Sequence, residues 1–171
     1  MSLLSRLLRP RDEGRAVLRP LWHRVVAIAR EPEWYAQCGI ADTVPGRFDA
    51  ITLVLALVLL RMEREPELVQ RSVLLTEIFV DDMDGQLRES GVGDVVVGKH
   101  MGRLMSVLGG RLGALREALP QGQDAVAEVV ARNVTLTGNG STASIAARAL
   151  ALAGELEAIP AAALLAGEIP R

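Results

Sequence analysis

The residues best suited to chemistry in this chain lie in and just before one uninterrupted run, from Asp81 to Asp94. The run combines a cluster of three aspartates, an Arg-Glu pair and a Gly-x-Gly-Asp turn. The charged residues of the whole run are Asp81, Asp82, Asp84, Arg88, Glu89 and Asp94. On a helix Glu77 and Asp81 would share a face, so one hypothesis is a helical enzyme that holds a metal ion on this face. The Glu-x-x-His pairs of helical di-iron proteins are absent from the chain. The simpler interpretation is an exposed helix on which Asp84 pairs with Arg88.

Other kinds of catalytic or cofactor chemistry find little support in the sequence. The segment from Gly93 to His100 is close to a phosphate-binding loop, but His100 replaces the hydroxyl residue that would ligate magnesium, and no strand precedes it. Histidine occurs only at His23 and His100, with no legible nucleophile–base arrangement beside either. We therefore expect no enzyme activity, no nucleotide, no cofactor and no bound metal.

Charge is distributed unevenly along the 171 residues, although the net charge is only −2. Residues 1–30 carry seven arginines and two acidic residues, a balance of +5, and the remainder carries −7. Such a basic end suits a negatively charged partner, either an anionic lipid surface or, with weaker support, RNA or the ribosome. The alternative is that this end is a solvated, frayed terminus. A membrane-surface role would fall to six residues, which are Leu3, Leu4, Arg6, Leu7, Leu8 and Arg9.

The elements that position these residues are all predicted to be helices. Pro10 should end a short N-terminal helix and Pro20 should begin the next. Apolar residues fill every turn between Ala50 and Leu60, which predicts a buried central helix over about 46–64 that is too short to span a membrane. Later helices should run from Pro66 to about Ser90, then to Leu119, to about Thr137 and to about Ala158. We expect an all-α fold of about seven helices, with a basic segment at 1–17 and one helical domain over 18–171.

The predicted helix from Val95 to Leu119 has an unusual composition. Small residues recur every four positions, and methionines lie beside them; the partner-binding candidates among these are Gly98, Met101, Gly102 and Met105. Interior glycines destabilise a helix, so their presence indicates close approach by another chain segment. Either a neighbouring helix of the same domain fills this groove, or it receives an apolar segment of a client protein, to which methionine can adapt.

Several short motifs, in order along the chain, together resemble the ubiquinol–cytochrome c chaperone family. They are Trp34-Tyr35, Gly39-Ile40-Ala41-Asp42-Thr43, Gly46-Arg47-Phe48, the run from Asp81 to Asp94, Gly110-Arg111, Arg132-Asn133-Val134 and Leu164-Leu165-Ala166-Gly167. The resemblance covers about Leu18 to Pro170. It implies a bacterial chaperone that binds immature cytochrome b during assembly of respiratory complex III. The partner-facing or motif residues that it implies are Tyr35, Asp42, Arg47, Phe48, Asp84, Arg88, Glu89, Asp94 and Arg111.

The sequence thus leaves three functional hypotheses. The first is a chaperone whose partner is the immature cytochrome b, with its apolar transmembrane segments, and which works in the cytoplasm or on the cytoplasmic face of the inner membrane. The second is the carboxylate-metal enzyme that uses Glu77 and Asp81. The third is a peripheral membrane adaptor without a chaperone role.

Overall fold

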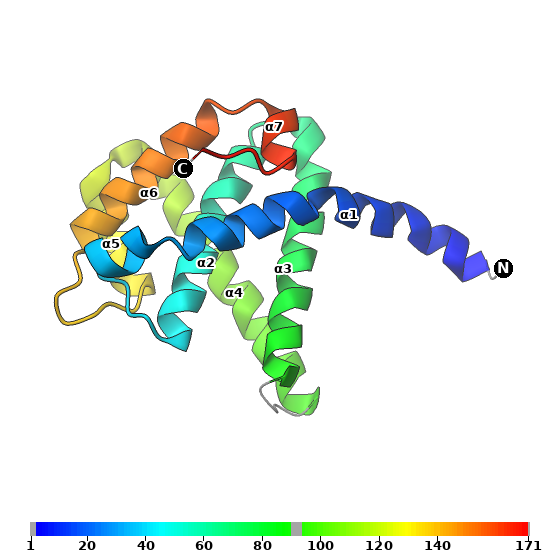
Figure 1. Ribbon diagram of the computed structural model, residues 1–171, viewed down its shortest axis with the longest axis horizontal. Helices are drawn as coiled ribbons and strands as arrows, with labels where there is room; N and C mark the ends of the chain where they lie inside the picture. The colour runs from blue at the N-terminus through cyan, green and yellow to red at the C-terminus, as the bar shows by residue number, and fades with distance from the viewer. Residues whose placement is uncertain (1–2, 90–93, 171) are drawn as a thin grey trace.

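The computed structural model describes the backbone of residues 3–89 and 94–170, and the side-chain surroundings of residues 13–86 and 102–170. Within these ranges the chain forms seven α-helices and no strand, which confirms the all-α prediction. Figure 1 shows their arrangement; they are α1 (Leu3–Ala29), α2 (Val44–Met62), α3 (Val69–Glu89), α4 (Asp94–Ala118), α5 (Gln123–Asn133), α6 (Thr142–Glu157) and α7 (Ala161–Leu165). A π-helical turn, Glu33–Gln37, joins α1 to α2, and short 3-10 turns, Pro66–Leu68 and Leu119–Gln121, precede α3 and follow α4.

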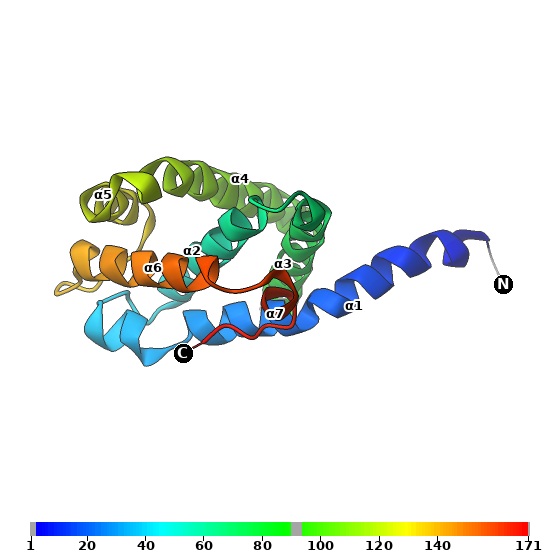
Figure 2. The ribbon, with the colours of Figure 1, turned by 90° about the horizontal axis from the view of Figure 1, so that it is seen from above.

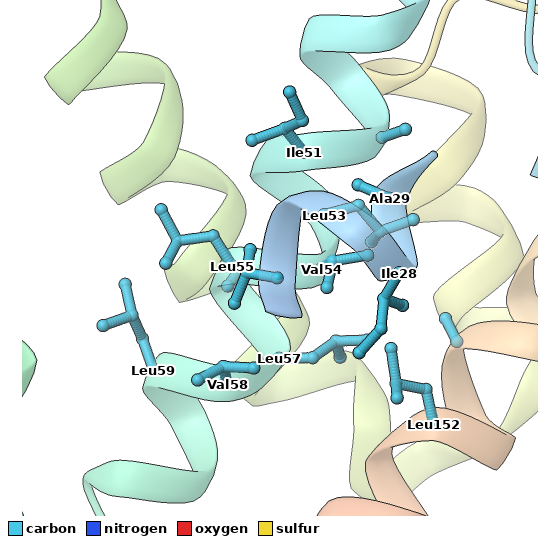
Figure 3. Close-up of a cluster of buried hydrophobic side chains, with 14 of the residues drawn as sticks. Ile28, Ala29, Ile51, Leu53, Val54, Leu55, Leu57, Val58, Leu59 and Leu152 are labelled. Atoms are coloured by element: carbon cyan, nitrogen blue, oxygen red, sulfur yellow. The ribbon is translucent and has the colours of Figure 1, made fainter. Parts of the chain in front are cut away.

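Helix α2 is the centre of the fold, as its apolar sequence predicts. It begins at Val44, where the hydroxyl of Thr43 accepts a hydrogen bond from the backbone N–H of Gly46. Every residue from Ala50 to Leu59 is buried. Figure 2 shows α1 on one side of α2 and α4 and α5 on the other. In Figure 3 the apolar side chains of α2 lie against residues of α1 and α6, among them Ile28 and Leu152.

Helix α1 differs from its prediction, because it runs without interruption from Leu3 to Ala29. The expected end at Pro10 and the expected start at Pro20 are therefore both wrong. A proline inside a helix removes one backbone hydrogen bond. At Pro20 the burial of Leu18, Leu21 and Trp22 on either side offsets that loss. The first turns of α1 project beyond the other helices (Figures 1 and 2). The division at residue 17 stays a prediction, and it falls within this continuous helix.

Helices α3 and α4 form an antiparallel pair beside α2. Leu75, Phe79 and Met83 of α3 are buried, and their four-residue spacing places them on one face of the helix. Helix α5 ends at Asn133, four residues before the predicted end, because the chain then turns into an extended segment that forms one isolated bridge, Leu136 to Ile40. None of the described helices is both long enough and apolar enough to cross a membrane.

Candidate binding cleft

An open cleft of about 710 Å³ lies where the end of α1, the π-helical turn, the start of α2 and the second half of α3 meet. We call it the binding cleft. Its lining is Arg30, Pro32, Tyr35, Ala36, Asp42, Val44, Arg47, Phe48, Ile51, Met83 and Gln86. Four of these, Tyr35, Asp42, Arg47 and Phe48, are residues that the sequence motifs single out, and two others, Met83 and Gln86, come from the run between Asp81 and Asp94. Two motif segments that are far apart in the sequence therefore meet in one hollow.

The π-helical turn fixes Tyr35 at the edge of the binding cleft. Its hydroxyl donates a hydrogen bond to the carbonyl of Ala29, 2.7 Å away. The neighbouring Trp34 is fully buried and donates through Nε1 to the carbonyl of Ile28 at 2.9 Å. On the other side of the indole the guanidinium of Arg148 stacks 5.4 Å from the ring centroid. Two anchored aromatic rings thus add to the backbone hydrogen bonds that hold this turn, such as the bond from the N–H of Cys38 to the carbonyl of Glu33 at 2.9 Å.

Partial burial raises the pKa of the Tyr35 hydroxyl above its ordinary value, and the negative charge of Asp42 adds to this effect. The positive charges of Arg47 and Arg30 oppose it. All three charged groups therefore lie close enough to Tyr35 to act on it electrostatically, and the hydroxyl stays neutral at physiological pH.

Asp42 and Arg47 form an ion pair across the mouth of the binding cleft. Nε of Arg47 donates to a carboxylate oxygen of Asp42 at 2.6 Å, and this hydrogen bond lowers the pKa of Asp42. The pair spans the first turn of α2, which packs tightly on the loop before it: a Cβ at Gly46 would lie 1.9 Å from the carbonyl oxygen of Ala41. Glycine at position 46 is what permits this approach.

The floor of the binding cleft is apolar, and its rim carries a cation. Phe48, Ile51 and Met83 form the floor, where the ring of Phe48 lies 6.3 Å from that of the buried Phe79. Val44 stands at the mouth with 84% of its surface exposed. Arg30 is exposed and forms no ion pair with any other described residue. The arrangement can take up an apolar side chain and, next to it, a negatively charged group.

Arg111 lies inside the fold, although the sequence motifs place it among the partner-facing residues. Its side chain is only 6% exposed, and it donates hydrogen bonds to the carboxylate of Asp49, to the hydroxyl of Thr52 and to the carbonyl of Asn133. Asp49 also accepts from the backbone N–H and the hydroxyl of Thr135, at 2.8 and 2.7 Å. This network ties α4 and the end of α5 to α2 and leaves Arg111 no route to a partner. In the sequence, the signal for this buried ion pair is the position of Asp49, directly before the apolar run that begins at Ala50.

The remaining predicted site residues are spread over α3 and α4. Asp84 lies on α3, is half-buried and has an interaction partner. Gly102 and Met105 lie on α4 and are exposed. No atom lies within 4 Å of a Cβ built at Gly102, Gly109, Gly110 or Gly113. The interpretation that a neighbouring helix fills this groove is therefore wrong at these four positions. The other candidates fall outside the described side chains; they are Arg88, Glu89, Asp94, Gly98, Met101, Leu3, Leu4, Arg6, Leu7, Leu8 and Arg9.

The described residues provide no set of metal ligands for the hypothesis of a carboxylate-metal enzyme. No three histidine, cysteine, aspartate or glutamate side chains there gather closely enough to hold a metal ion. Asp81, one of the two carboxylates that the hypothesis uses, forms an ion pair with Arg15 of α1. That pairing ties α3 to α1.

Comparison with known proteins gives two matches for this chain. A family model described as ubiquinol-cytochrome C chaperone matches residues 36–171. Among solved structures, the crystal structure of the Cbp3 homolog from Brucella abortus matches with a TM-score of 0.79 and 32% sequence identity. That match covers 98% of this chain and 95% of the other. No match is found among curated proteins.

Proposed function

Because this chain belongs to the ubiquinol–cytochrome c chaperone family, we propose that it binds newly made cytochrome b and protects it until respiratory complex III is assembled. The observation that carries the proposal is the meeting of the motif segment 35–48 with Met83 and Gln86, two residues of the run that begins at Asp81, in the binding cleft. Family motifs that are scattered in sequence and gathered in one hollow indicate a shared binding surface.

The chemistry of the binding cleft suits a segment of an unassembled membrane protein. Its apolar floor can shield an apolar side chain from water, and burial of such a side chain contributes about 1.5–3 kcal/mol. Arg30 can pair with a carboxylate that follows in the client, while Arg47 is already held by Asp42. An occupant that combines both features is the junction between a transmembrane segment and its charged flank.

The open face of α4 supplies a second surface for the same client. Because its glycines have no side chains, the backbone of this face is uncovered, and another helix can approach it closely. Met105 is 41% exposed beside them, and a methionine side chain adapts to varied apolar partners. We propose that a transmembrane segment of cytochrome b lies along this face before it enters the bilayer.

The role is binding without catalysis. None of the residues that line the binding cleft is a serine, cysteine, histidine or lysine. Tyr35 and Asp42 are the lining residues that could act as a base, but the pKa of the Tyr35 hydroxyl is raised and the pKa of Asp42 is lowered by its hydrogen bond from Arg47, so neither suits general base catalysis at neutral pH. The cleft is therefore suited to recognition.

A photo-crosslinking amino acid at position 44 tests the proposal. The side chain of Val44 is at the mouth of the binding cleft and nearly fully exposed, so its replacement should not disturb the fold. Cytochrome b produced by cell-free translation should form a crosslink to position 44. The matched control is Val69, an exposed valine at the first residue of α3 that does not line the cleft.

In the same assay Val44→Glu should abolish capture and Val69→Glu should leave it unchanged. Equal crosslinking from positions 44 and 69 would contradict a specific cleft. Absence of cytochrome b from both would favour the adaptor without a chaperone role.

A further inference from the structure

A second hollow, of about 590 Å³, lies between α1 and α3 and does not belong to the binding cleft, although Arg30 lines both. Cationic or protonatable side chains line it at four positions, Arg15, Arg19 and His23 on α1 and Arg30 directly after the end of that helix. On an α-helix, residues at these spacings point to nearly the same side, because each residue turns the chain by about 100°. The hollow is therefore bordered by three arginines, Arg15 and Arg19 on one face of α1 and Arg30 beyond its end.

Two carboxylates of α3 also line this hollow, so its three arginines exceed its carboxylates by one positive charge. Asp81 forms an ion pair with Arg15, and Asp82 accepts a hydrogen bond from Gln86 at 3.2 Å. Arg19 and Arg30 are both exposed, and neither forms an ion pair with any residue of the described part of the chain. These two arginines are thus available for an external anion.

We propose that this face of α1 docks on the phosphate headgroups of an anionic membrane. Arg19 and Arg30 are eleven residues apart, which corresponds to about 16 Å along the helix. That separation suits several phosphates in a row and is too long for one phosphate group held between them. The +5 balance of residues 1–30 adds a longer-range attraction of the same sign.

RNA, the other phosphate-rich partner, fits the hollow less well. Single-stranded nucleic acid is bound largely by stacking of its bases on exposed aromatic rings. The one aromatic side chain of this hollow, Trp22, is 4% exposed and packs edge-on against Phe79, with ring centroids 5.9 Å apart. It offers no ring face to a base.

Docking through this face would place the binding cleft at the membrane surface. Arg30 lines both the hollow and the cleft, so the two openings adjoin. A protein that handles a membrane-inserted client gains from such an orientation, but the inference does not depend on which client is bound. Vesicle binding and client capture can therefore fail independently.

The test is sedimentation of the full-length protein with vesicles made of equal parts phosphatidylglycerol and phosphatidylcholine. Arg19→Gln should lower the partition coefficient about five-fold, the contribution of one arginine near an anionic surface. Arg132→Gln is the matched control, because Arg132 is an exposed arginine on α5, which lies across the molecule from α1 in Figure 2. Both variants should melt at the temperature of the unchanged protein.

The unchanged protein should bind these vesicles at low salt and release them as the salt concentration is raised. It should not bind vesicles of phosphatidylcholine alone. Equal weakening by the two variants, or none by either, would overturn the proposal. It would also fail if millimolar glycerol phosphate saturated Arg19 while vesicles did not bind, which would indicate a site for free phosphate. Retention of single-stranded RNA that depended on Arg19, without vesicle binding, would show that RNA is the partner.

Discussion

At the residue scale, the arginines of this protein divide into those that the fold holds inside and those that it leaves at the surface. Arg61 is 7% exposed and donates to the carbonyls of Leu156 and Ile159, both at 2.9 Å, where α6 ends. Such bonds satisfy carbonyls that a helix end leaves without a partner. Arg111 is buried in the same way against Asp49. Arg19 and Arg30 remain exposed, and the two proposals depend on them.

Arg111→Ala should destabilise the protein by about 3–5 kcal/mol, because the change leaves the carboxylate of Asp49 buried without its partner. Urea unfolding measures the effect. The control is Arg116→Ala, on the same helix, which breaks an exposed ion pair with Glu63 and should cost less than about 1 kcal/mol. If the two variants lost similar amounts of unfolding free energy, the buried network would stabilise the fold no more than an exposed ion pair does.

Asp42 should titrate below the ordinary range of an aspartate, because Arg47 donates a hydrogen bond to its charged form. The pKa is lower in the folded state, so the pair stabilises the fold above the ordinary carboxyl range, and this contribution disappears as the pH falls through the folded pKa. Carbon-13 NMR of the side-chain carboxyl measures the midpoint. Arg47→Gln should shift it upward, and an unchanged midpoint would mean that the pair does not persist in solution.

At the element scale, helices with a strong apolar pattern could be predicted and their interruptions could not. The burial of α2 follows directly from its uncharged run between Ala50 and Leu60. The continuity of α1 through Pro20 could not be predicted, because it depends on contacts with helices that are distant in the sequence. One such contact is made by Gly167, where a Cβ would lie 2.7 Å from the carbonyl oxygen of Pro20.

The open face of α4 predicts opposite results for two glycines. Gly102→Ala should raise stability by about 0.5–1 kcal/mol, since nothing is near the added methyl group and alanine is the better helix former. Gly46→Ala should instead destabilise by about 1–3 kcal/mol through overpacking on Ala41. Thermal melting of both variants measures the difference.

A larger side chain at the same place, Gly102→Leu, should leave the melting temperature nearly unchanged and weaken capture of cytochrome b. A variant that is normal in both stability and capture would show that the face of α4 is vacant.

The projecting start of α1 is a separate element to test. Leu3, Leu4, Leu7 and Leu8 would add apolar burial to the attraction of the basic residues, so removal of residues 1–10 should reduce sedimentation with anionic vesicles. The comparison is made at low salt, where the complete protein is bound to the vesicles. If the shortened and complete proteins sediment equally at low salt, this segment has no membrane role.

At the scale of the whole molecule, the fold class and four of the eleven residues of the binding cleft could be predicted from sequence. The family motifs lead to Tyr35, Asp42, Arg47 and Phe48, which the structure gathers in one cleft. The contribution of Arg30 could not be predicted, because no motif contains it and its position depends on how the end of α1 packs beside α2. The sequence pattern predicts which residues lie in the same helix. Which helices meet at a common surface depends on how they pack against one another in the folded protein.

The molecule therefore has a proposed client-binding cleft and a proposed membrane-facing hollow that adjoin at one arginine. In this arrangement α1 and α3 pack directly against each other, and both openings lie along the surface where these two helices meet. The proposed functions follow from this placement.

The most direct test of the central claim is a pull-down of the tagged protein from native membranes, with the co-purified proteins identified by mass spectrometry. Cytochrome b should be the main membrane protein recovered, and Val44→Glu should remove it while Val69→Glu retains it. Recovery of cytochrome b that is equal for both variants would contradict the binding cleft. Recovery of none with the unchanged protein would contradict the chaperone role itself.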